Sequence, residues 1–542
     1  MDYGVIMNKF ARSLIIVFCY LLLTSNLILP AFLSAQIPEW VYQYVHPSSS
    51  DEWSSAIVVD SLGNTYTTGV LSSDDTTGGH ISGISVIKLN TSGQQKWIYF
   101  NDTLARHAYG NDIAFKFNKV YVTGYAQFLN NNKDLIVLCL DTSGVTDWIH
   151  RDTVAGEANA VIAVSPNTVY IAGFTYGSSL DIIAKKLDSL GNEVWRYVYD
   201  GPAGNYDEAN CLAIDKNENI HIGGYSTGIS TAEDFTVIKL DSAGNEQWVY
   251  RYDGPANYRD ELKALTLDPL GNIYMTGWSW GIVGEWDFCV VKIDSSGQEQ
   301  WVYRYDAPSN MWDLVYDLAV DDSGNAYVCG CSDDVDTTSL FTVIKVDSHG
   351  NEQWCYFDAG PNDNGGIAIC VVLDGFGGVY AGGFLRNTSY RAQIAVAKLN
   401  LFGDTLWTYI YPHVPPSPSG ADVTHDIVAD IDGNIYVAGR INVSTWNDDI
   451  VVMKFASLQG VLEEVKIEKI ANNKSASSIF RGGVDIFLDE SAQVVIYDVV
   501  GRPILQQSLP SKQRINIKLQ PGVYFMRVGE RGNKVMQKII IL

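Results

Sequence analysis

Short apolar runs recur along most of the chain, and tight turns or longer polar stretches separate them. One representative set of four runs covers residues 211–214, 220–224, 235–240 and 247–252. These runs are rich in β-branched and aromatic residues, which is typical of β-strands. Many are joined by Asp-x-x-Gly, in which the Asp caps its own backbone and the Gly accepts a positive φ. The pattern predicts repeating units of four strands.

A phrase of apolar-Lys-apolar-Asp-Ser-x-Gly, with Trp four residues after the Gly, recurs with variations through the chain. Its Trp residues are spaced by 51, 47, 53, 53, 53 and 53 residues, and they are Trp97, Trp148, Trp195, Trp248, Trp301, Trp354 and Trp407. A second phrase, with Gly-Asn-apolar-Tyr in its clearest copies, ends at Gly69, Gly124, Gly173, Gly224, Gly277, Gly330, Gly383 and Gly439. Four-stranded units that recur every ~40–50 residues indicate the blades of a β-propeller.

The eighth copy ends at residues 448–455 without a Trp, so the last unit lacks its fourth strand there. A matching strand stands at the other end of the chain, where residues 38–44 read PEWVYQY and supply Trp40 as the eighth Trp. Pairing these two segments leaves the ring without an exposed edge. We therefore expect an all-β fold with an eight-bladed β-propeller over residues 36–458, closed by its N-terminal strand. The eight Trp are expected to pack between blades.

The N-terminus has the features of an export signal. Lys9 and Arg12 precede an unbroken apolar run over residues 14–23, and Ser34-Ala35 supplies small residues at the expected cleavage site. This order predicts a cleaved signal peptide over residues 1–35. The alternative is a membrane anchor, but polar residues and Pro30 interrupt the ~20 apolar residues that a spanning helix needs. We expect no stable transmembrane span after signal removal.

Charge divides the chain into two parts. The 62 acidic residues outnumber the 37 basic ones, which gives a formal net charge of -25. Such a surface repels phosphate backbones, so nucleic acid is excluded as a partner. From Glu464 onward, however, 12 basic residues exceed 7 acidic ones. This asymmetry indicates two units with different roles.

The sequence contains no His-Glu-x-x-His motif and no phosphate-binding loop, and we predict no catalytic residue. We also predict no metal site and no cofactor. Calcium at an Asp-x-x-Gly loop stays open as an alternative, and Asp430 with Asp432 is the best case. That loop lacks the bidentate Glu of a calcium-binding loop, which favours a hairpin turn.

Loop lengths differ between the two faces expected for the ring. Turns between first and second strands, and between third and fourth, are short, whereas the other connections are longer and varied. Ligands usually bind such loops above a rigid scaffold. On the longer loops we identify candidate binding residues: Trp278, Trp280, Trp286, Trp312, Tyr258, Asp260 and Asp313. The alternative is that these Trp residues pack against neighbouring blades.

The repeats resemble a bacterial β-propeller repeat family named for seven blades, and our count exceeds that name by one. The resemblance rests on Asp-x-x-Gly-Asn-apolar-Tyr-x-x-Gly and on Lys-Leu-Asp-x-x-Gly, and it implies no catalytic residue. The Asp-x-x-Gly-x-x-x-Trp segment also resembles the tryptophan-docking motif of eight-bladed quinoproteins. Those enzymes bind pyrroloquinoline quinone with calcium and often use adjacent cysteines. No adjacent cysteine pair occurs here, which favours a structural role for the Trp residues.

The C-terminal residues resemble the sorting domain read by the type IX secretion system of Bacteroidetes. The matching positions are Tyr497, Asp498, Gly501, Arg502, Gly522, Tyr524 and Lys538. The resemblance covers residues 483–542 and implies a small β-sandwich, preceded by a linker over residues 459–482. It also implies that the partner is the type IX secretion machinery and that the protein is secreted or held at the cell surface, via the periplasm and outer membrane. The alternative is an ordinary β-sandwich that binds or spaces.

These patterns lead to one functional hypothesis and one alternative. We expect an exported, non-enzymatic propeller that acts as a binding or scaffold module, with a polysaccharide or a surface protein as its partner. The alternative is a secreted glycan-active hydrolase or lyase that uses acidic residues on the propeller face.

Overall fold

The structure, a computed structural model, describes residues 36–45, 52–74, 80–101, 106–128, 132–309, 311–333, 338–413, 420–444 and 447–457, together with the strands of the C-terminal region. In these residues the fold is all-β, as predicted, apart from the short 3-10 helix η1 (Pro361–Asp363). The predicted signal peptide and most of the predicted linker lie outside the described residues. Within the described part, no helix has the length and apolar character needed to cross a bilayer.

Four separate antiparallel sheets each contain four strands in chain order. The first two are formed by β13 (Asp207–Ile214), β14 (Ile220–Thr227), β15 (Glu233–Leu240) and β16 (Glu246–Tyr252), and by β17 (Asp260–Leu267), β18 (Ile273–Trp280), β19 (Trp286–Ile293) and β20 (Glu299–Tyr305). The next two are formed by β21 (Asp313–Val320), β22 (Ala326–Asp333), β23 (Ser339–Val346) and β24 (Glu352–Asp358), and by β25 (Gly366–Leu373), β26 (Gly378–Arg386), β27 (Ala392–Asn400) and β28 (Thr405–Ile410).

The strands between Trp53 and Tyr199 join into one eleven-stranded sheet. They are β2 (Trp53–Val59), β3 (Thr65–Asp74), β4 (His80–Leu89), β5 (Gln95–Asn101), β6 (His107–Lys116), β7 (Lys119–Gln127), β8 (Lys133–Asp141), β9 (Thr146–Ser165), β10 (Thr168–Tyr176), β11 (Leu180–Leu187) and β12 (Glu193–Tyr199). Two features merge these strands. A single parallel pair, Ser82 with His107, links β4 to β6, and β9 pairs first with β8 and then with β10. Strand β9 stays extended because residues 152–160 lack the Asp-Gly-Pro turn of later connections.

One further four-stranded sheet contains both ends of the repeat region. Its order is β1-β31-β30-β29, from β1 (Trp40–Tyr44), β29 (Val423–Ala429), β30 (Ile435–Ser444) and β31 (Asn447–Phe455). Strand β1 is antiparallel to β31, with Trp40 opposite Lys454 and Tyr44 opposite Ile450. Segments more than 400 residues apart in the sequence therefore share one sheet, which we call the closing sheet.

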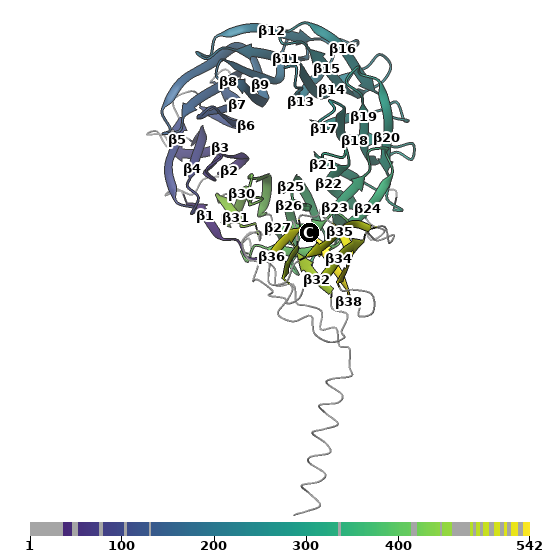
Figure 1. The fold of residues 1–542 in the computed structure, drawn as a ribbon. Coiled ribbons are helices and arrows are strands. Elements are labelled where there is room, and N and C mark those ends of the chain that lie inside the picture. The colour runs from purple at the N-terminus through teal and green to yellow at the C-terminus, as the bar shows by residue number, and fades with distance from the viewer. Residues whose placement is uncertain are drawn as a thin grey trace, which may run out of the picture. The chain divides into compact units, whose positions relative to one another are not determined.

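The sheets formed by β1 to β31 follow one another around a ring (Figure 1). The first strands of neighbouring units contact each other directly, including the last and the first. Ile57 in β2 donates its backbone N–H to Asp426 in β29, at 2.8 Å. Apolar side chains fill the space between successive sheets. Phe235 of one sheet, for example, packs in the same cluster as Leu262 and Met275 of the next, so burial of apolar surface holds the sheets together.

The C-terminal region contains two further sheets. The larger has the order β32-β38-β37-β34-β35, from β32 (Ser477–Phe480), β34 (Ala492–Tyr497), β35 (Pro503–Leu509), β37 (Gly522–Val528) and β38 (Val535–Ile541). The smaller pairs β33 (Val484–Phe487) with β36 (Arg514–Ile517). All pairs are antiparallel except β32 with β38.

Candidate binding site

Seven of the eight recurring Trp residues, all except Trp407, lie on the glycine of the next unit's turn between third and fourth strands. A Cβ added to Gly350, for instance, would stand 2.8 Å from the Trp301 ring. Many of the indoles also donate through Nε1 to a carbonyl of that turn, at 2.9–3.2 Å: Trp40, Trp97, Trp148, Trp195, Trp301 and Trp354. The Trp residues therefore contact neighbouring units, which is the geometry of docking.

Two other side chains of the repeated phrase take part in the same contact, and the sequence analysis missed them. The phrase Lys donates to the same carbonyl as the Trp, as Lys292 and Trp301 do to Ser348. The Tyr two residues after the Trp donates to a Glu of the next unit, as Tyr303 does to Glu352 at 2.5 Å. The repeated Lys and Tyr were visible in the sequence, but their partners lie 49 to 56 residues away.

The Asp-x-x-Gly loops have their carboxylates occupied by the turn itself. Asp430 accepts hydrogen bonds at Oδ1 from the N–H groups of Asp432 and Asn434, and at Oδ2 from the Asn434 amide and the Tyr436 hydroxyl. This is the geometry of a turn cap.

Three aspartates link the first strands of neighbouring units. Asp112, Asp317 and Asp426 each accept the next residue's N–H and, at 2.8 Å, an N–H of the following unit's first strand. Burial raises the pKa of Asp112 and Asp317 to about 6 and that of Asp426 to about 7. Although their pKa values approach neutrality, both oxygens of each carboxylate accept hydrogen bonds that hold the first strands of neighbouring units together.

The predicted aromatic residues form a cluster at the ends of β18 and β19. Trp280 pairs directly with Trp286 across the two strands, and their ring centroids are 4.9 Å apart. Tyr258 contacts Trp280 edge-on at 5.1 Å, and Trp278 contacts Trp286 at 5.9 Å. The structure thus brings together four of the five aromatic residues selected from the sequence.

The aromatic residues differ in how much they are exposed. Tyr258 and Trp312 each keep 53% of their surface exposed, and Trp312 donates through Nε1 to Glu285 at 2.6 Å. Trp278 instead donates to the carbonyl of Val315 in the next unit, and Lys263 lies 4.1 Å from its ring centroid. Trp278 therefore packs between units, whereas Tyr258 and Trp312 are free to meet a ligand.

Asp260 and Asp313 are buried rather than presented beside the aromatic rings. Asp260 accepts N–H groups from Gly254 and Trp280, and Asp313 accepts the N–H of Ala307. Burial raises the pKa of Asp260 to about 6 and that of Asp313 to about 7. Both side chains hold the connection between two units in shape. Glu285, which the candidate set omitted, is the acid beside Trp312.

Two groups of three carboxylates could hold a metal ion. They are Asp181, Asp200 and Asp207, and Asp234, Asp253 and Asp260. In each group, one carboxylate oxygen from every residue lies within 4.8 Å of the others. Sequence reasoning missed these groups because their members come from two successive units.

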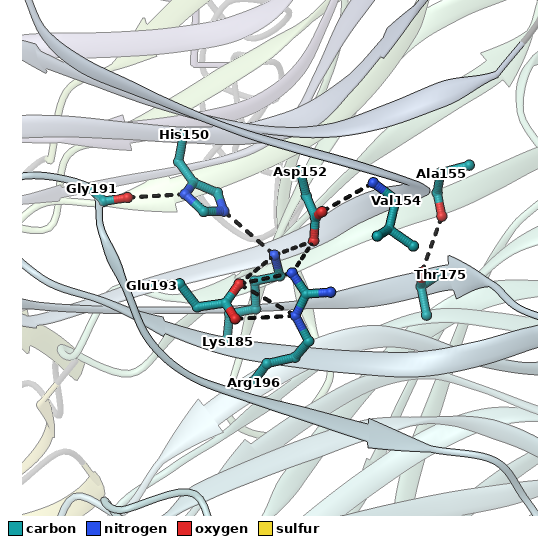
Figure 2. A network of polar contacts seen from close by, with 9 residues as sticks. All are labelled: His150, Asp152, Val154, Ala155, Thr175, Lys185, Gly191, Glu193 and Arg196. Atoms are coloured by element: carbon teal, nitrogen blue, oxygen red, sulfur yellow. Dashed lines mark hydrogen bonds and ion pairs between the residues drawn. The ribbon is translucent and has the colours of Figure 1, made fainter.

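A buried ionic network replaces apolar packing at one place between units (Figure 2). Lys185 is fully buried and pairs with Asp152 and with Glu193, the latter at 2.9 Å. Arg196 pairs with the same two carboxylates at 2.6 and 3.0 Å. Burial alone would raise the pKa of Glu193, but hydrogen bonds from Arg196 and Lys185 lower it to about 2. Because every charge has an opposite partner, the network is a structural contact.

Of the predicted sorting residues, Tyr497 lies in β34, Gly522 and Tyr524 lie in β37, and Lys538 lies in β38. Phe525, next to Tyr524, pairs with both Tyr497 and Lys538, so these positions meet in adjacent strands of one sheet. Asp498, Gly501 and Arg502 lie outside the described residues.

Comparison with known proteins supports both parts of the chain. Residues 480–542 match the family described as secretion system C-terminal sorting domain, and residues 251–282 and 418–444 match beta-propeller repeat. The resemblances to a β-propeller repeat family and to the type IX sorting domain are confirmed. No curated protein matches the chain.

Solved structures with detectable similarity are distant. Polysaccharide lyase Uly1 is 12% identical, with a TM-score of 0.41, covering 67% of this chain and 92% of that one. Raptor of Chaetomium thermophilum is 8% identical, with a TM-score of 0.40, covering 78% of this chain and 29% of that one. A putative gluconolactonase is 14% identical, with a TM-score of 0.27, covering 51% and 84%.

Proposed function

We propose that this protein, a β-propeller repeat protein exported through the type IX secretion system to the cell surface or extracellular space, is a non-enzymatic polysaccharide-binding module. The observation that carries the proposal is that Tyr258, which contacts Trp280, and Trp312, which donates to Glu285, are both half-exposed. Rigid aromatic rings combine a large apolar face with a polar edge, which suits the mixed surface of a sugar ring. Glu285 next to Trp312 supplies a hydrogen-bond acceptor for a hydroxyl.

The charge of the chain narrows the class of polysaccharide. The net charge is -25, and Glu285 and Asp253 lie on the loops that carry the aromatic residues. A polyanionic glycan would be repelled there, so we infer a neutral or basic polymer. A surface protein is the other class of partner. The glycan array described below distinguishes the two, because a protein that binds only a surface protein would bind no glycan.

The ring would serve this function as a rigid frame. We infer eight blades over residues 36–458, with the closing sheet as the last one, and Trp40 to Trp407 as docking residues between blades. Residues 1–35 would be the signal peptide, residues 459–482 a linker, and residues 483–542 the sorting domain that meets the type IX machinery.

The alternative is a secreted glycan hydrolase or lyase. Its acids would be Asp112, Asp317 and Asp426, since their raised pKa values resemble those of catalytic carboxylates. We favour the binding module because each of these carboxylates already accepts two backbone N–H groups.

A glycan array probed with the purified protein tests the proposal. Binding should be lost in a Tyr258→Ala, Trp312→Ala double variant and kept in Tyr390→Ala, which removes a 71% exposed aromatic residue from the loop between β26 and β27. No glycan binding, or binding that the double variant retains, would overturn the proposal. Chromatography of the bound polymer after incubation distinguishes a binding module from a hydrolase or lyase, because only an enzyme releases shorter products.

A further inference from the structure

The two carboxylate groups occupy equivalent places in consecutive units. Asp181, Asp200 and Asp207 are each 53 residues before Asp234, Asp253 and Asp260. In each group, one Asp lies at the start of a third strand, one follows the fourth strand, and one opens the first strand of the next unit. Each group therefore lies where one unit passes into the next, apart from the Asp-x-x-Gly turns, and the second group borders the aromatic cluster at Asp260.

The spacing of the oxygens fits a divalent cation. One oxygen from each carboxylate lies within 4.8 Å of the other two in both groups. Calcium binds oxygen at about 2.3–2.6 Å, so two ligands on opposite sides of one ion are ~4.6–5.2 Å apart. Three carboxylates supply negative charge in excess of the ion's two positive charges, and backbone carbonyls and water can complete its shell of 6–8 oxygens.

A buried, unpartnered oxygen gives an independent indication in the second group. Asp234 is only 4% exposed, and its Oδ2 accepts hydrogen bonds from Arg251 and Thr231. Its Oδ1 has no hydrogen-bond partner among the residues that the structure describes. A buried carboxylate oxygen without a partner costs free energy, which a bound cation would offset.

The third carboxylate of that group is already positioned. Asp260 accepts N–H groups from Gly254 at Oδ2 and from Trp280 at Oδ1, so the connection over residues 253–260 fixes its orientation. Each of these oxygens retains a second lone pair that can face an ion. Asp253 is exposed at the outer side, which leaves a route for a cation to enter.

The two groups differ in how far their negative charge is compensated. Arg251 pairs with Asp234 at 2.7 Å in the second group. At the equivalent position of the first group stands Val198, which brings no charge. Burial and then the charge of Asp200 raise the pKa of Asp181, as expected for carboxylates that repel each other. The first group is therefore the stronger cation site.

We propose that both groups bind a divalent cation, calcium, and that the Asp181 group binds it more tightly than the Asp234 group. The ion joins the end of one unit to the start of the next. The inference stands independently of the proposed polysaccharide binding, since its ligands are carboxylates whereas the proposed glycan contacts are Tyr258 and Trp312. Asp253 lies on the same loop as Tyr258.

Titration of the purified full-length protein with CaCl2 after chelator treatment tests this inference. We expect two sites by calorimetry, with Kd values in the ~10⁻⁴–10⁻³ M range of extracellular calcium modules or tighter. Asp200→Asn should remove the tighter site and Asp253→Asn the weaker one. Both substituted side chains are exposed and keep their shape as Asn, so the fold should persist.

Terbium luminescence gives a second readout, because the backbone N–H of Trp280 donates to Asp260 and the indole of that residue can sensitise a terbium ion in the second group. The matched control is Asp306→Asn, at the equivalent place in the following unit, where the described residues form no such group. Calcium binding that persists in the Asp200→Asn, Asp253→Asn double variant would overturn the inference, and so would a wild-type protein that binds no calcium. Ten-fold tighter binding of MgCl2 than CaCl2 would overturn the choice of calcium.

Discussion

Trp407 stacks on Phe455, with ring centroids 5.4 Å apart and ring planes 24° from parallel. The preceding Trp residues of the repeat lie on a turn glycine of the next unit. Among the described residues Trp407 meets no such turn, because β31 ends at Phe455 and the fourth strand of that sheet comes from the N-terminus. Its buried Nε1 has no hydrogen-bond partner among these residues. Phe455 packs on its ring instead.

The first prediction concerns this substitute contact. Phe455→Ala should lower the free energy of unfolding by about 3–5 kcal/mol, because the side chain is buried and packs on both Trp407 and Tyr409. Chemical denaturation measures the change. The control Phe402→Ala removes an exposed ring and should change stability by less than ~0.5 kcal/mol. Equal effects of the two substitutions would show that the Trp407 contact contributes nothing.

The glycines beneath the Trp rings allow a matched comparison. Gly350 has φ +87°, and a Cβ there would stand 2.8 Å from Trp301, whereas Gly375 has φ +73° with no atom within 4 Å. Gly350→Ala should cost about 2–4 kcal/mol, from a strained backbone and displacement of the ring. Gly375→Ala should cost only about 1–2 kcal/mol, from backbone strain alone. Denaturation curves of the two variants that coincide would contradict a close Trp contact.

The buried network should behave differently from an exposed ion pair. Lys185→Met leaves Asp152 and Glu193 with Arg196 as their remaining cation, so we expect a loss of about 3–5 kcal/mol. Lys119→Met breaks an ion pair with Asp147 that is one-third exposed and should cost less than ~1 kcal/mol. Thermal unfolding of both variants measures the difference, and a Lys185→Met protein as stable as Lys119→Met would contradict the network's role.

The aspartates between first strands predict how stability depends on pH. Burial raises the pKa of Asp426 to about 7, above its unfolded value of ~3.9. Between these values the folded state holds a proton that the unfolded state releases, so stability rises as the pH falls from about 7 to 4. Asp426→Asn cannot ionise and should flatten this dependence in denaturation curves recorded from pH 4 to 8. An unchanged slope would show that Asp426 does not titrate with a raised pKa.

The sorting domain predicts the location of a truncated chain. Deletion of residues 483–542 should prevent release to the surface or medium, because it removes all but the first three residues of the segment that matches the sorting family. Fractionation of cells and immunoblotting measure the location, with the full-length Tyr390→Ala variant as a control for expression. Full-level export of the truncated protein would contradict a sorting role.

The repeated phrases predict the strands and hairpins because they contain the residues that form tight turns. The N-terminal segment predicts the closing strand because it contains the Trp that the last repeat lacks. The phrase Lys was equally visible, yet its role depends on a carbonyl 56 residues away, as with Lys292 and Ser348. Asp260 and Asp313 were selected as ligand residues because they stand beside aromatic residues, but spacing does not reveal that backbone N–H groups already occupy their oxygens. The merging of sheets through β9 likewise depends on a turn that the sequence lacks.

The closing sheet also orders events during synthesis. Strand β1 is made first but has no partner until β31, which ends at Phe455, has left the ribosome. The segment that matches the sorting family begins at residue 480. Every chain that contains this sorting domain therefore already contains both β1 and β31 of the closing sheet. A chain truncated within the repeats lacks both the sorting domain and β31, the strand that pairs with β1. The order of segments therefore restricts export to chains that are long enough to complete the ring.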